Sequence, residues 1–232
     1  MKLVKLNKID GRIILESGLH IGAGDSEMHI GGTDKTVIAH PHSREPYIPG
    51  SSIKGKVRSL LEMRSGLVVH TKGAPLNTDV LRKVSGQARN EAISILRLFG
   101  VSGADTDEAL EVGPTRVSFA DCMLTQESRE LAQKNNWPLT EVKSENAIDR
   151  IRGTAISPRF TERVPAGLSF NFSVSIKEME GDLNLTDLLL QGLKLLELDA
   201  LGGSGSRGYG RVRFEFNNQE IQIAFNAISP LG

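Results

Sequence analysis

Two hydrophobic periodicities alternate along the chain, and their order constrains the fold more than any other feature of the sequence. Alternation of apolar and polar residues, which is typical of strands, occurs in four segments: 3–19 (as a strand pair), 113–124, 168–176 and 209–216. Apolar residues spaced three and four apart, which is typical of helices that bury one face, occur in three segments: 53–61, 77–99 and 186–199. Because strands precede, separate and follow the helices, we expect a sheet layer covered by a helix layer.

This order predicts an α+β fold of the ferredoxin-like kind, interrupted by large insertions. Turn and cap residues mark its boundaries: Pro49–Ser52 stops one element and caps the next, Thr186 caps the Leu-rich helix, and Gly202-Gly203 ends it. Residues 20–47 read as a long loop, a kind of segment that is usually functional or disordered. Residues 137–165 mix Pro, Gly, Arg and isolated apolar residues, which indicates a projecting hairpin or arm.

Composition excludes several classes of protein. The 232 residues are 39% hydrophobic and 24% charged, as in ordinary globular proteins. We expect no membrane association, because no apolar run approaches the roughly 20 residues that a membrane span needs. Cys122 is the single cysteine, which fits a reducing cytoplasm and predicts a small core residue rather than a nucleophile.

The net charge argues against a uniformly basic surface, since 28 basic residues are matched by 28 acidic ones. The basic residues nevertheless concentrate in 54–64, 150–163 and 207–213, whereas acidic residues concentrate in 105–111 and 178–182. Steering depends on the local field rather than on the summed charge. This segregation predicts a basic groove on a neutral body.

The segment Leu201–Arg211 holds five glycines in nine residues between a predicted helix and a predicted strand. Glycines let a backbone approach a ligand closely and expose its amide donors. Arg207 and Arg211 add cations, and Tyr209 offers a face for stacking. The segment therefore predicts a site for phosphate or an RNA backbone, and its alternative is a flexible loop that follows a helix.

The segment Ile48–Arg58 nearly matches a phosphate-binding P-loop, but Val57 stands where magnesium binding needs Ser or Thr. We therefore reject nucleotide hydrolysis. Lys54 and Arg58 lie four residues apart and are expected to point into the same solvent region near a capped helix start. The pair predicts a phosphate site, with an ordinary solvated basic face as the alternative.

Two further segments hold candidate residues. The pair His40-x-His42 lacks a completing zinc ligand and is expected to lie on a surface loop. Asp34 follows Gly31-Gly32 and is able to present a carboxylate to a phosphodiester, or to be an ordinary turn aspartate. The arm carries guanidinium groups beside apolar residues, which suits a strand with splayed bases and equally suits protein contacts.

Taken together, these segments resemble the RAMP superfamily, and most closely the repeating backbone subunit of the type III-A CRISPR effector, the Csm complex. The resemblance covers nearly the whole chain in family order, through these stretches: Gly18–Gly22, Ile30–Asp34, Ile48–Arg58, Glu141–Lys143 to Asp149–Ile151, and Gly192–Asp199 running into Leu201–Arg211. The last stretch is the most specific.

The resemblance implies one RRM-like domain over 1–232, with insertions at about 20–47, 66–112 and 137–165, the last forming a thumb. It implies that copies stack head to tail along a guide CRISPR RNA, beside other subunits of the Csm complex. Target RNA would pair with the guide and be cut at regular intervals, where each thumb interrupts the duplex.

The resemblance also implies roles for particular residues. Asp34 would be the cleavage residue and would bind a divalent ion, Mg²⁺ or Mn²⁺, or accept the proton of a 2′-hydroxyl. Cleavage would be a transesterification that leaves a 2′,3′-cyclic phosphate and a 5′-hydroxyl. The residues implied to bind RNA are His20, Ser51, Ser52, Lys54, Arg58, Arg150, Arg152, Gly203, Ser204, Gly205, Ser206, Arg207 and Gly208.

Three alternatives stay open at this point. The chain could be a scaffold that binds guide RNA without cutting targets. It could be a guide-processing endoribonuclease of the same superfamily, with His20 as its catalytic histidine. A phosphate-binding metabolic enzyme is the third, which the arginine-rich arm disfavours.

Overall fold

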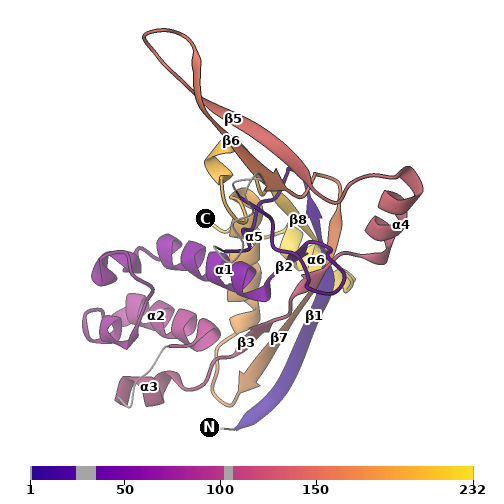
Figure 1. The fold of residues 1–232 in the computed structure, drawn as a ribbon. Coiled ribbons are helices and arrows are strands. Elements are labelled where there is room, and N and C mark those ends of the chain that lie inside the picture. The colour runs from indigo at the N-terminus through magenta and orange to yellow at the C-terminus, as the bar shows by residue number, and fades with distance from the viewer. Residues whose placement is uncertain (1, 25–34, 102–106, 232) are drawn as a thin grey trace.

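A four-stranded antiparallel sheet forms the centre of the protein (Figure 1). The computed structural model describes residues 2–24, 35–101 and 107–231. The strand order is β3-β7-β1-β8, with these bounds: β3 Val117–Phe119, β7 Ser169–Met179, β1 Leu3–Leu15 and β8 Val212–Phe216. Side chains of β7 alternate between buried and more open positions, with Phe170, Phe172 and Val174 on the buried face. The sheet thus presents one apolar face to the helices.

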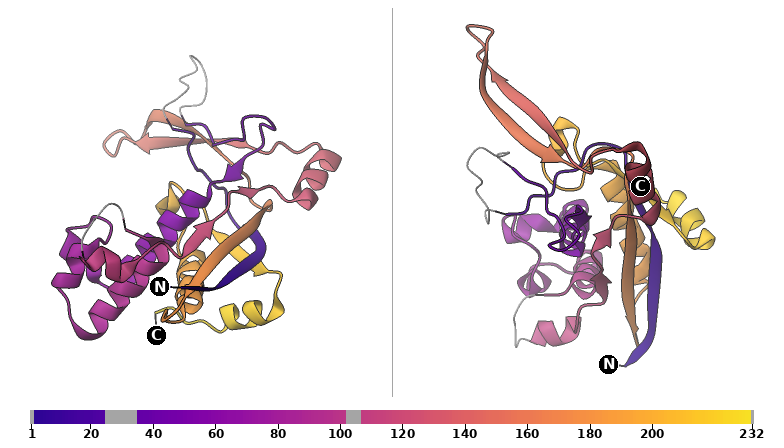
Figure 2. Two further views of the ribbon diagram at one scale, coloured as in Figure 1. Left: turned by 90° about the horizontal axis from the view of Figure 1, so that it is seen from below. Right: turned by 45° about the vertical axis from the view of Figure 1, so that its right-hand side comes forward.

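Two smaller strand pairs lie outside this sheet. Strand β2 (Tyr47–Ile48) pairs with β4 (Cys122–Met123), and β5 (Glu141–Ile148) pairs with β6 (Ala155–Arg163), both antiparallel. The β5–β6 hairpin projects away from the body, as Figure 1 and the right-hand view of Figure 2 show. It confirms the arm predicted at 137–165, and "the arm" hereafter means Glu141–Arg163.

Two of the helices form the layer that covers the sheet. Helices α1 (Gly50–Arg64) and α5 (Leu185–Leu198) contact each other and cover the sheet. The remaining α-helices are α2 Gly86–Phe99, α3 Asp107–Val112, α4 Gln126–Asn135 and α6 Gln219–Asn226. Three short 3-10 helices complete the described chain: η1 Leu67–Thr71, η2 Thr78–Arg82 and η3 Gly205–Arg207. None of the described helices is long and apolar enough to cross a membrane.

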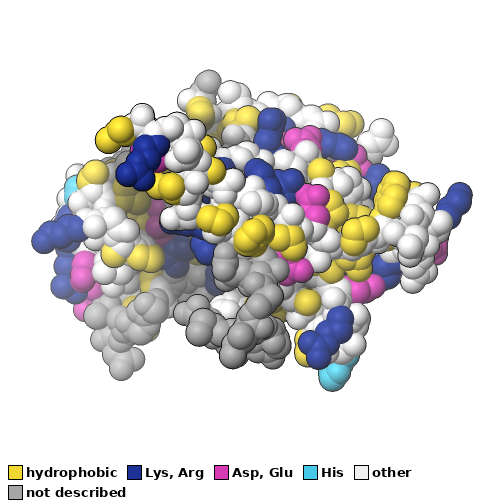
Figure 3. Space-filling view, turned by 45° about the horizontal axis from the view of Figure 1, so that its top comes forward, with side chains coloured by type: hydrophobic (Ala, Val, Ile, Leu, Met, Phe, Trp, Pro, Cys, Tyr) yellow, Lys and Arg dark blue, Asp and Glu magenta, His cyan; other side chains and the backbone are white. Residues whose placement is uncertain are grey.

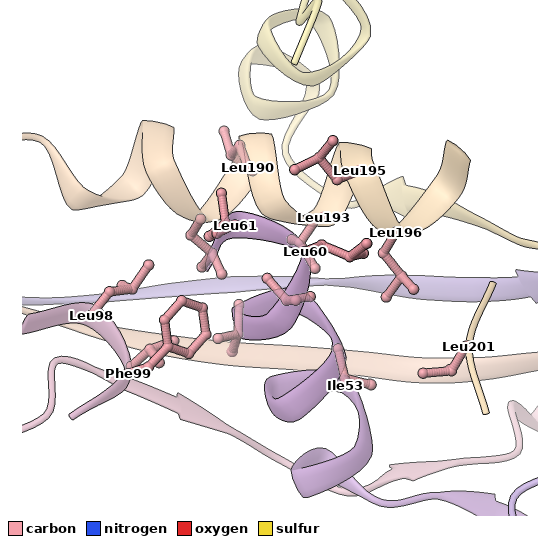
Figure 4. Packing of buried hydrophobic residues seen from close by; sticks show 14 of the residues in the cluster. Ile53, Leu60, Leu61, Leu98, Phe99, Leu190, Leu193, Leu195, Leu196 and Leu201 are labelled. Carbon is pink, nitrogen blue, oxygen red and sulfur yellow. The ribbon is translucent and has the colours of Figure 1, made fainter. Parts of the chain in front are cut away.

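The core lies between the helix layer and the sheet. Figure 4 shows leucines of α5 and α1 gathered where the two helices cross, above the strands. The crossing is close at Gly192, because a Cβ there would lie 2.6 Å from Val57 Cγ1. Cys122 is fully buried in the same core, and burial raises the pKa of its thiol to about 12. The thiol therefore stays protonated and unreactive, as the sequence predicted.

Several predicted boundaries are wrong. The predicted strand pair at 3–19 is a single long strand, Leu3–Leu15, because β7 pairs with β1 along almost its whole length. Residues 113–124 form two short strands, β3 and β4, which join different sheets. Residues 77–99 form η2 and then α2, with the break at Ser85 and Gly86, whose φ of 58° is left-handed. Helix periodicity alone does not detect such a break.

Helix caps also differ from the prediction. The Asn184 side chain accepts a hydrogen bond from Asp187 N, so Asn184 rather than Thr186 caps α5. Pro49 is the N-cap residue of α1 and no side chain caps this helix, so the neighbouring serines do not act as predicted. The backbone N–H of Gly50 donates instead to Asp121 Oδ1 at 2.8 Å. Helices α3, α4 and α6 were not predicted; each is short, between 6 and 10 residues.

A buried ion pair joins the residue before β3 to the turn after β7. Arg116, just before β3, donates from Nε and Nη2 to the two carboxylate oxygens of Asp182 at 2.9 and 3.0 Å, and both side chains are almost fully buried. Burial alone would raise the pKa of Asp182, but the hydrogen bonds from Arg116 and Met179 N outweigh it, and the pKa is lowered. The folded state therefore favours the charged carboxylate.

We expect Asp182→Asn to destabilise the fold by about 3–5 kcal/mol, because the charge of Arg116 would stay buried without its partner. Since the folded-state pKa of Asp182 is lowered, its contribution is fully present above the ordinary Asp pKa and is lost as the pH falls through the lowered value. Urea denaturation at pH 7 and pH 3 measures both effects. A difference between the wild type and the variant that is as large at pH 3 as at pH 7 would contradict this assignment.

Candidate nucleic-acid interface

A groove of about 580 Å³ opens at the base of the arm. One wall is the glycine loop, defined here as Gly202–Gly208, and the other is formed by His20–Gly22 and Lys35. The groove thus joins two segments that lie about 180 residues apart in the sequence. His20 and residues of the predicted glycine-rich site, proposed separately from the sequence, share one surface.

The glycine loop is held directly against His20. Gly203 N donates to the backbone carbonyl of His20 at 2.9 Å. Gly202 has a left-handed φ of 74°, and a Cβ on it would lie 2.3 Å from that carbonyl oxygen. Only glycine fits this approach. The flexible-loop alternative is therefore wrong for this end of the segment, which is packed and hydrogen-bonded.

Glu162, on β6 of the arm, connects the groove to its surroundings through four hydrogen bonds. Its backbone carbonyl lies 2.7 Å from His20 Nδ1, and its N–H donates to the Lys35 carbonyl at 3.0 Å. Its carboxylate accepts from Val37 N and from the Thr140 hydroxyl, both at 2.8 Å. Glu162 therefore joins the arm, the groove and the long loop at one point.

The long loop at 20–47 has a paired stem. Gly22 and Val37 form an antiparallel bridge, and Ile38 N donates to the Ile21 carbonyl at 2.8 Å. Lys35 forms a parallel bridge with Thr161 of the arm. The predicted cleavage residue Asp34 lies outside the described residues, but it is bonded to Lys35, which lines the groove.

Arg207, on the glycine loop, is held by a carboxylate of the arm. Its Nε lies 3.0 Å from Glu145 Oε2, and its guanidinium also donates to the Ser204 hydroxyl. Burial alone would raise the pKa of Glu145, but a hydrogen bond from Tyr209 and the charges of Arg207 and Lys143 lower it. Glu145 is therefore charged at neutral pH.

The prediction that Tyr209 offers a stacking face is wrong. Its side chain is only 1% exposed, and its hydroxyl donates to Glu145 Oε1 at 3.0 Å. Lys143 and Arg163 of the arm lie over its ring, 4.7 and 4.9 Å from the centroid. Tyr209 is thus packed against the base of the arm, between Gly208 and Gly210, which both have left-handed φ values.

The prediction that Arg58 points into solvent with Lys54 is also wrong. The guanidinium of Arg58 binds Glu62 at 2.7 Å and the carbonyls of Gly100 and Leu76 at 3.0 and 2.6 Å. Arg58 therefore ties the insertion at 66–112, which contains Leu76 and Gly100, to α1 instead of facing a ligand.

Lys54 differs from Arg58 in its electrostatic surroundings. It is half-buried, and its pKa is lowered, first by partial burial and then by the charge of Arg58. Both effects disfavour the charged ammonium group, and an anionic ligand placed beside it would offset them by favouring the charged form. Ser51 and Ser52 precede it in the first turn of α1. Of the two cations predicted on this helix, Lys54 is thus the better candidate for a phosphate contact.

The basic clusters of the sequence are largely neutralised within the protein. Most of their cations form ion pairs, which join these residues: Lys56–Asp199, Arg58–Glu62, Arg64–Glu91, Arg163–Glu141, Arg207–Glu145 and Arg213–Glu215. Figure 3 shows basic and hydrophobic side chains mixed over the face that carries the arm, without a continuous basic surface. The predicted basic groove is therefore a small number of cations on a neutral body.

The tip of the arm is open to solvent. Arg150 and Arg152 lie in its turn, where Arg152 is 80% exposed and its Nε lies 4.0 Å from Asp149 Oδ2. Ile151 between them is 97% exposed, and Phe160 further down is 45% exposed. Apolar side chains flanked by guanidinium groups suit unstacked bases, as expected from the sequence.

The described residues contain no group of three or more His, Cys, Asp or Glu side chains that could hold a metal ion. His40 and His42 lie on the surface turn before β2, with ring centroids 5.6 Å apart. The Nδ1 atom of His40 lies 3.4 Å from the backbone N–H groups of His42 and Ser43. These contacts agree with the predicted surface loop.

The fold agrees with what comparison with known proteins finds. The model of the RAMP superfamily matches residues 12–213, which is most of the chain. The chain therefore belongs to the RAMP superfamily.

Within that superfamily, the similarity is to Csm3 proteins. The chain is 39% identical over 235 residues to the CRISPR system endoribonuclease Csm3 of Methanothermobacter thermautotrophicus, covering 96% of this chain and 88% of that protein. It is 38% identical over 225 residues to Csm3 of Enterococcus italicus, covering 93% and 92%. The chain is thus a member of the Csm3 family.

Solved structures agree with this placement. A Csm3–Csm4 subcomplex of a type III-A CRISPR-Cas interference complex matches with a TM-score of 0.54 and 28% identity, covering 93% of this chain and 78% of the matched chain. Csm3 of Methanopyrus kandleri matches with a TM-score of 0.58 at 24% identity, covering 91% and 75%, and supports the fold.

Sequence reasoning missed Lys35, which lines the groove. It also missed Glu145 and Glu162, which contact the lining residues Arg207 and His20. Each is an ordinary charged residue in a loop or an exposed strand, and no local pattern distinguishes it. The alternation of the arm strands places Glu145 and Glu162 on opposite faces, but only the tertiary contacts show what each face meets.

We expect Gly202→Ala to destabilise the protein by about 2–4 kcal/mol, because the new Cβ would collide with the His20 carbonyl and the backbone would be strained. Gly208→Ala is the matched control, since its φ is 83° but nothing lies within 4 Å of its Cβ position. The control should show the backbone strain alone, about 1–2 kcal/mol. Equal losses for the two variants in urea denaturation would show that the contact with His20 is unimportant.

Proposed function

We propose that this protein is a backbone subunit of a type III-A CRISPR effector that binds guide RNA and cuts complementary target RNA. The single observation that carries the proposal is the groove in which His20, Lys35 and the glycine loop meet at the base of an exposed arm. The printed names of its Csm3 relatives, endoribonucleases of CRISPR systems, support the activity. The Csm3–Csm4 subcomplex supports assembly with other Csm subunits.

The guide RNA would follow the groove. Backbone amides and serine hydroxyls of the glycine loop suit phosphate oxygens, and Lys54 with the start of α1 offers a second phosphate contact. These contacts carry no base specificity, so the subunit would accept guides of any sequence. Successive copies stacked head to tail along the guide would repeat the same contacts at regular intervals.

The arm would act on the guide–target duplex. Its exposed apolar residues and the guanidinium groups of Arg150 and Arg152 would insert beside a displaced nucleotide. A kinked target strand brings its 2′-hydroxyl toward the line of attack on the neighbouring phosphorus, which lowers the orientational cost of transesterification. The 2′-oxygen bonds to phosphorus, the 5′-oxygen leaves, and a 2′,3′-cyclic phosphate and a 5′-hydroxyl result.

Asp34 would take part in this step beside the groove, since it is bonded to the groove residue Lys35. A divalent cation, Mg²⁺ or Mn²⁺, would neutralise charge that develops on the phosphate. Asp34 and RNA phosphate oxygens would hold it, because the described residues supply no further cluster of ligands. Asp34 would alternatively accept the proton of the 2′-hydroxyl.

In an assembled complex, Asp34→Ala should lower the rate of target cleavage by about 10²–10⁴-fold while guide RNA stays bound. Glu220→Ala, an exposed carboxylate on α6 outside the groove, is the control and should cut normally. Cleavage products of a complementary labelled target, mapped on a sequencing gel, measure the effect. Regular cutting by the Asp34 variant at the wild-type rate would remove Asp34 from the mechanism and favour another nuclease in the complex.

The role of the metal has its own test. An excess of chelator should abolish cutting by the assembled wild-type complex, and added Mg²⁺ or Mn²⁺ should restore it, because charge on the phosphate would again be neutralised. Binding of the target, followed by a mobility shift, should persist in chelator. Unchanged cleavage in chelator would contradict the metal step and leave proton transfer as the role of Asp34.

A further inference from the structure

The base of the arm places a carboxylate inside the surface proposed to bind RNA. Glu145 Oε2 lies 3.0 Å from Nε of Arg207, and Arg207 belongs to the groove lining. A carboxylate at this place repels a phosphate and occupies the cation that the phosphate would use. The carboxylate therefore works against phosphate binding at Arg207.

The surroundings of Glu145 keep it charged and in place. Its other oxygen, Oε1, accepts the hydrogen bond of the buried Tyr209 hydroxyl at 3.0 Å, and Lys143 Nζ lies 3.5 Å from that same oxygen. The Glu145 side chain is 22% exposed, whereas the Arg207 side chain is 53% exposed. Tyr209 and Lys143 therefore hold the Glu145 carboxylate in place, while the Arg207 side chain remains accessible from the groove.

We propose that Glu145 competes with the RNA backbone for Arg207. When guide RNA is loaded, Arg207 leaves the Glu145 carboxylate and binds a phosphate instead. The exchange lowers the affinity of the free subunit for RNA. It also releases one of the contacts between the arm and the glycine loop, so that loading loosens the base of the arm on this side. This inference rests on the proposed function, because it requires RNA in the groove.

The exchange is feasible because the pair is only partly buried. An ion pair at this exposure is worth a small amount, and a phosphate offers Arg207 two oxygens in the geometry that a guanidinium prefers. The hydrogen bond from Tyr209 would hold Glu145 in place after Arg207 leaves. Lys143 would remain near enough to balance its charge.

The test compares the binding of a labelled single-stranded RNA to the 232-residue chain and to its Glu145→Gln variant, in chelator to prevent cutting. Glutamine keeps the acceptor for Tyr209 but loses the charge. The variant should bind about two- to fivefold more tightly, which corresponds to the loss of one exposed ion pair. The matched control is Glu141→Gln, which removes the same charge from the arm base at the Arg163 pair, 2.7 Å long, and leaves Arg207 paired.

The outcomes separate the possible failures. If Glu145→Gln binds more tightly than Glu141→Gln, and the gain disappears in an Arg207→Gln background, the exchange is supported. If Glu145→Gln binds like Glu141→Gln or more weakly than wild type, Glu145 does not compete for Arg207 and the inference is overturned while the proposed function stands. If wild type and both variants fail to bind RNA and assembled complexes lack guide RNA, both proposals fail.

Discussion

The close crossing of α1 and α5 at Gly192 is the contact on which the rest of the structure depends. A side chain at this position would collide with Val57 and Leu61, so the helices could not approach each other and also cover the sheet. The crossing fixes the direction in which α5 leaves the core and therefore where the glycine loop begins. It also sets the position of the first turns of α1, which carry Lys54. Hydrophobic packing of the core thereby determines the geometry of the polar surface.

The base of the arm is the second junction. Glu162 joins β6 to His20 and to the stem of the long loop, while Tyr209 beneath it supports Lys143 and Arg163. These contacts make the arm, the groove and the loop one unit. A change in the angle of the arm would move His20 through the contact between its ring and the Glu162 carbonyl, and Lys35 through a backbone hydrogen bond. This arrangement gives a physical reason why the kink in the target strand at the arm and the cleavage step at the long loop would keep a fixed relative position.

Charge in this protein is organised mainly for structure. Arg58, Arg116 and Arg163 each bind carboxylates or carbonyls of the protein, and these contacts join segments that are distant in the sequence. The equal numbers of basic and acidic residues make this internal pairing possible. Recognition of RNA would depend on backbone amides and on a few cations placed at the groove. Such a surface limits nonspecific binding, because most of its charge is already neutralised.

The sequence by itself determined the fold class, the arm and the family, since hydrophobic periodicity and the run from Gly192 to Arg211 are local patterns that survive without coordinates. It also indicated His20 and the glycine loop, which the structure brings into one groove. Only the tertiary structure decided that Tyr209 is buried, that Arg58 is internal and that Glu145 and Glu162 build the arm's base. The physical reason is that burial and pairing depend on neighbours distant in the chain, and residue type and spacing carry no record of them.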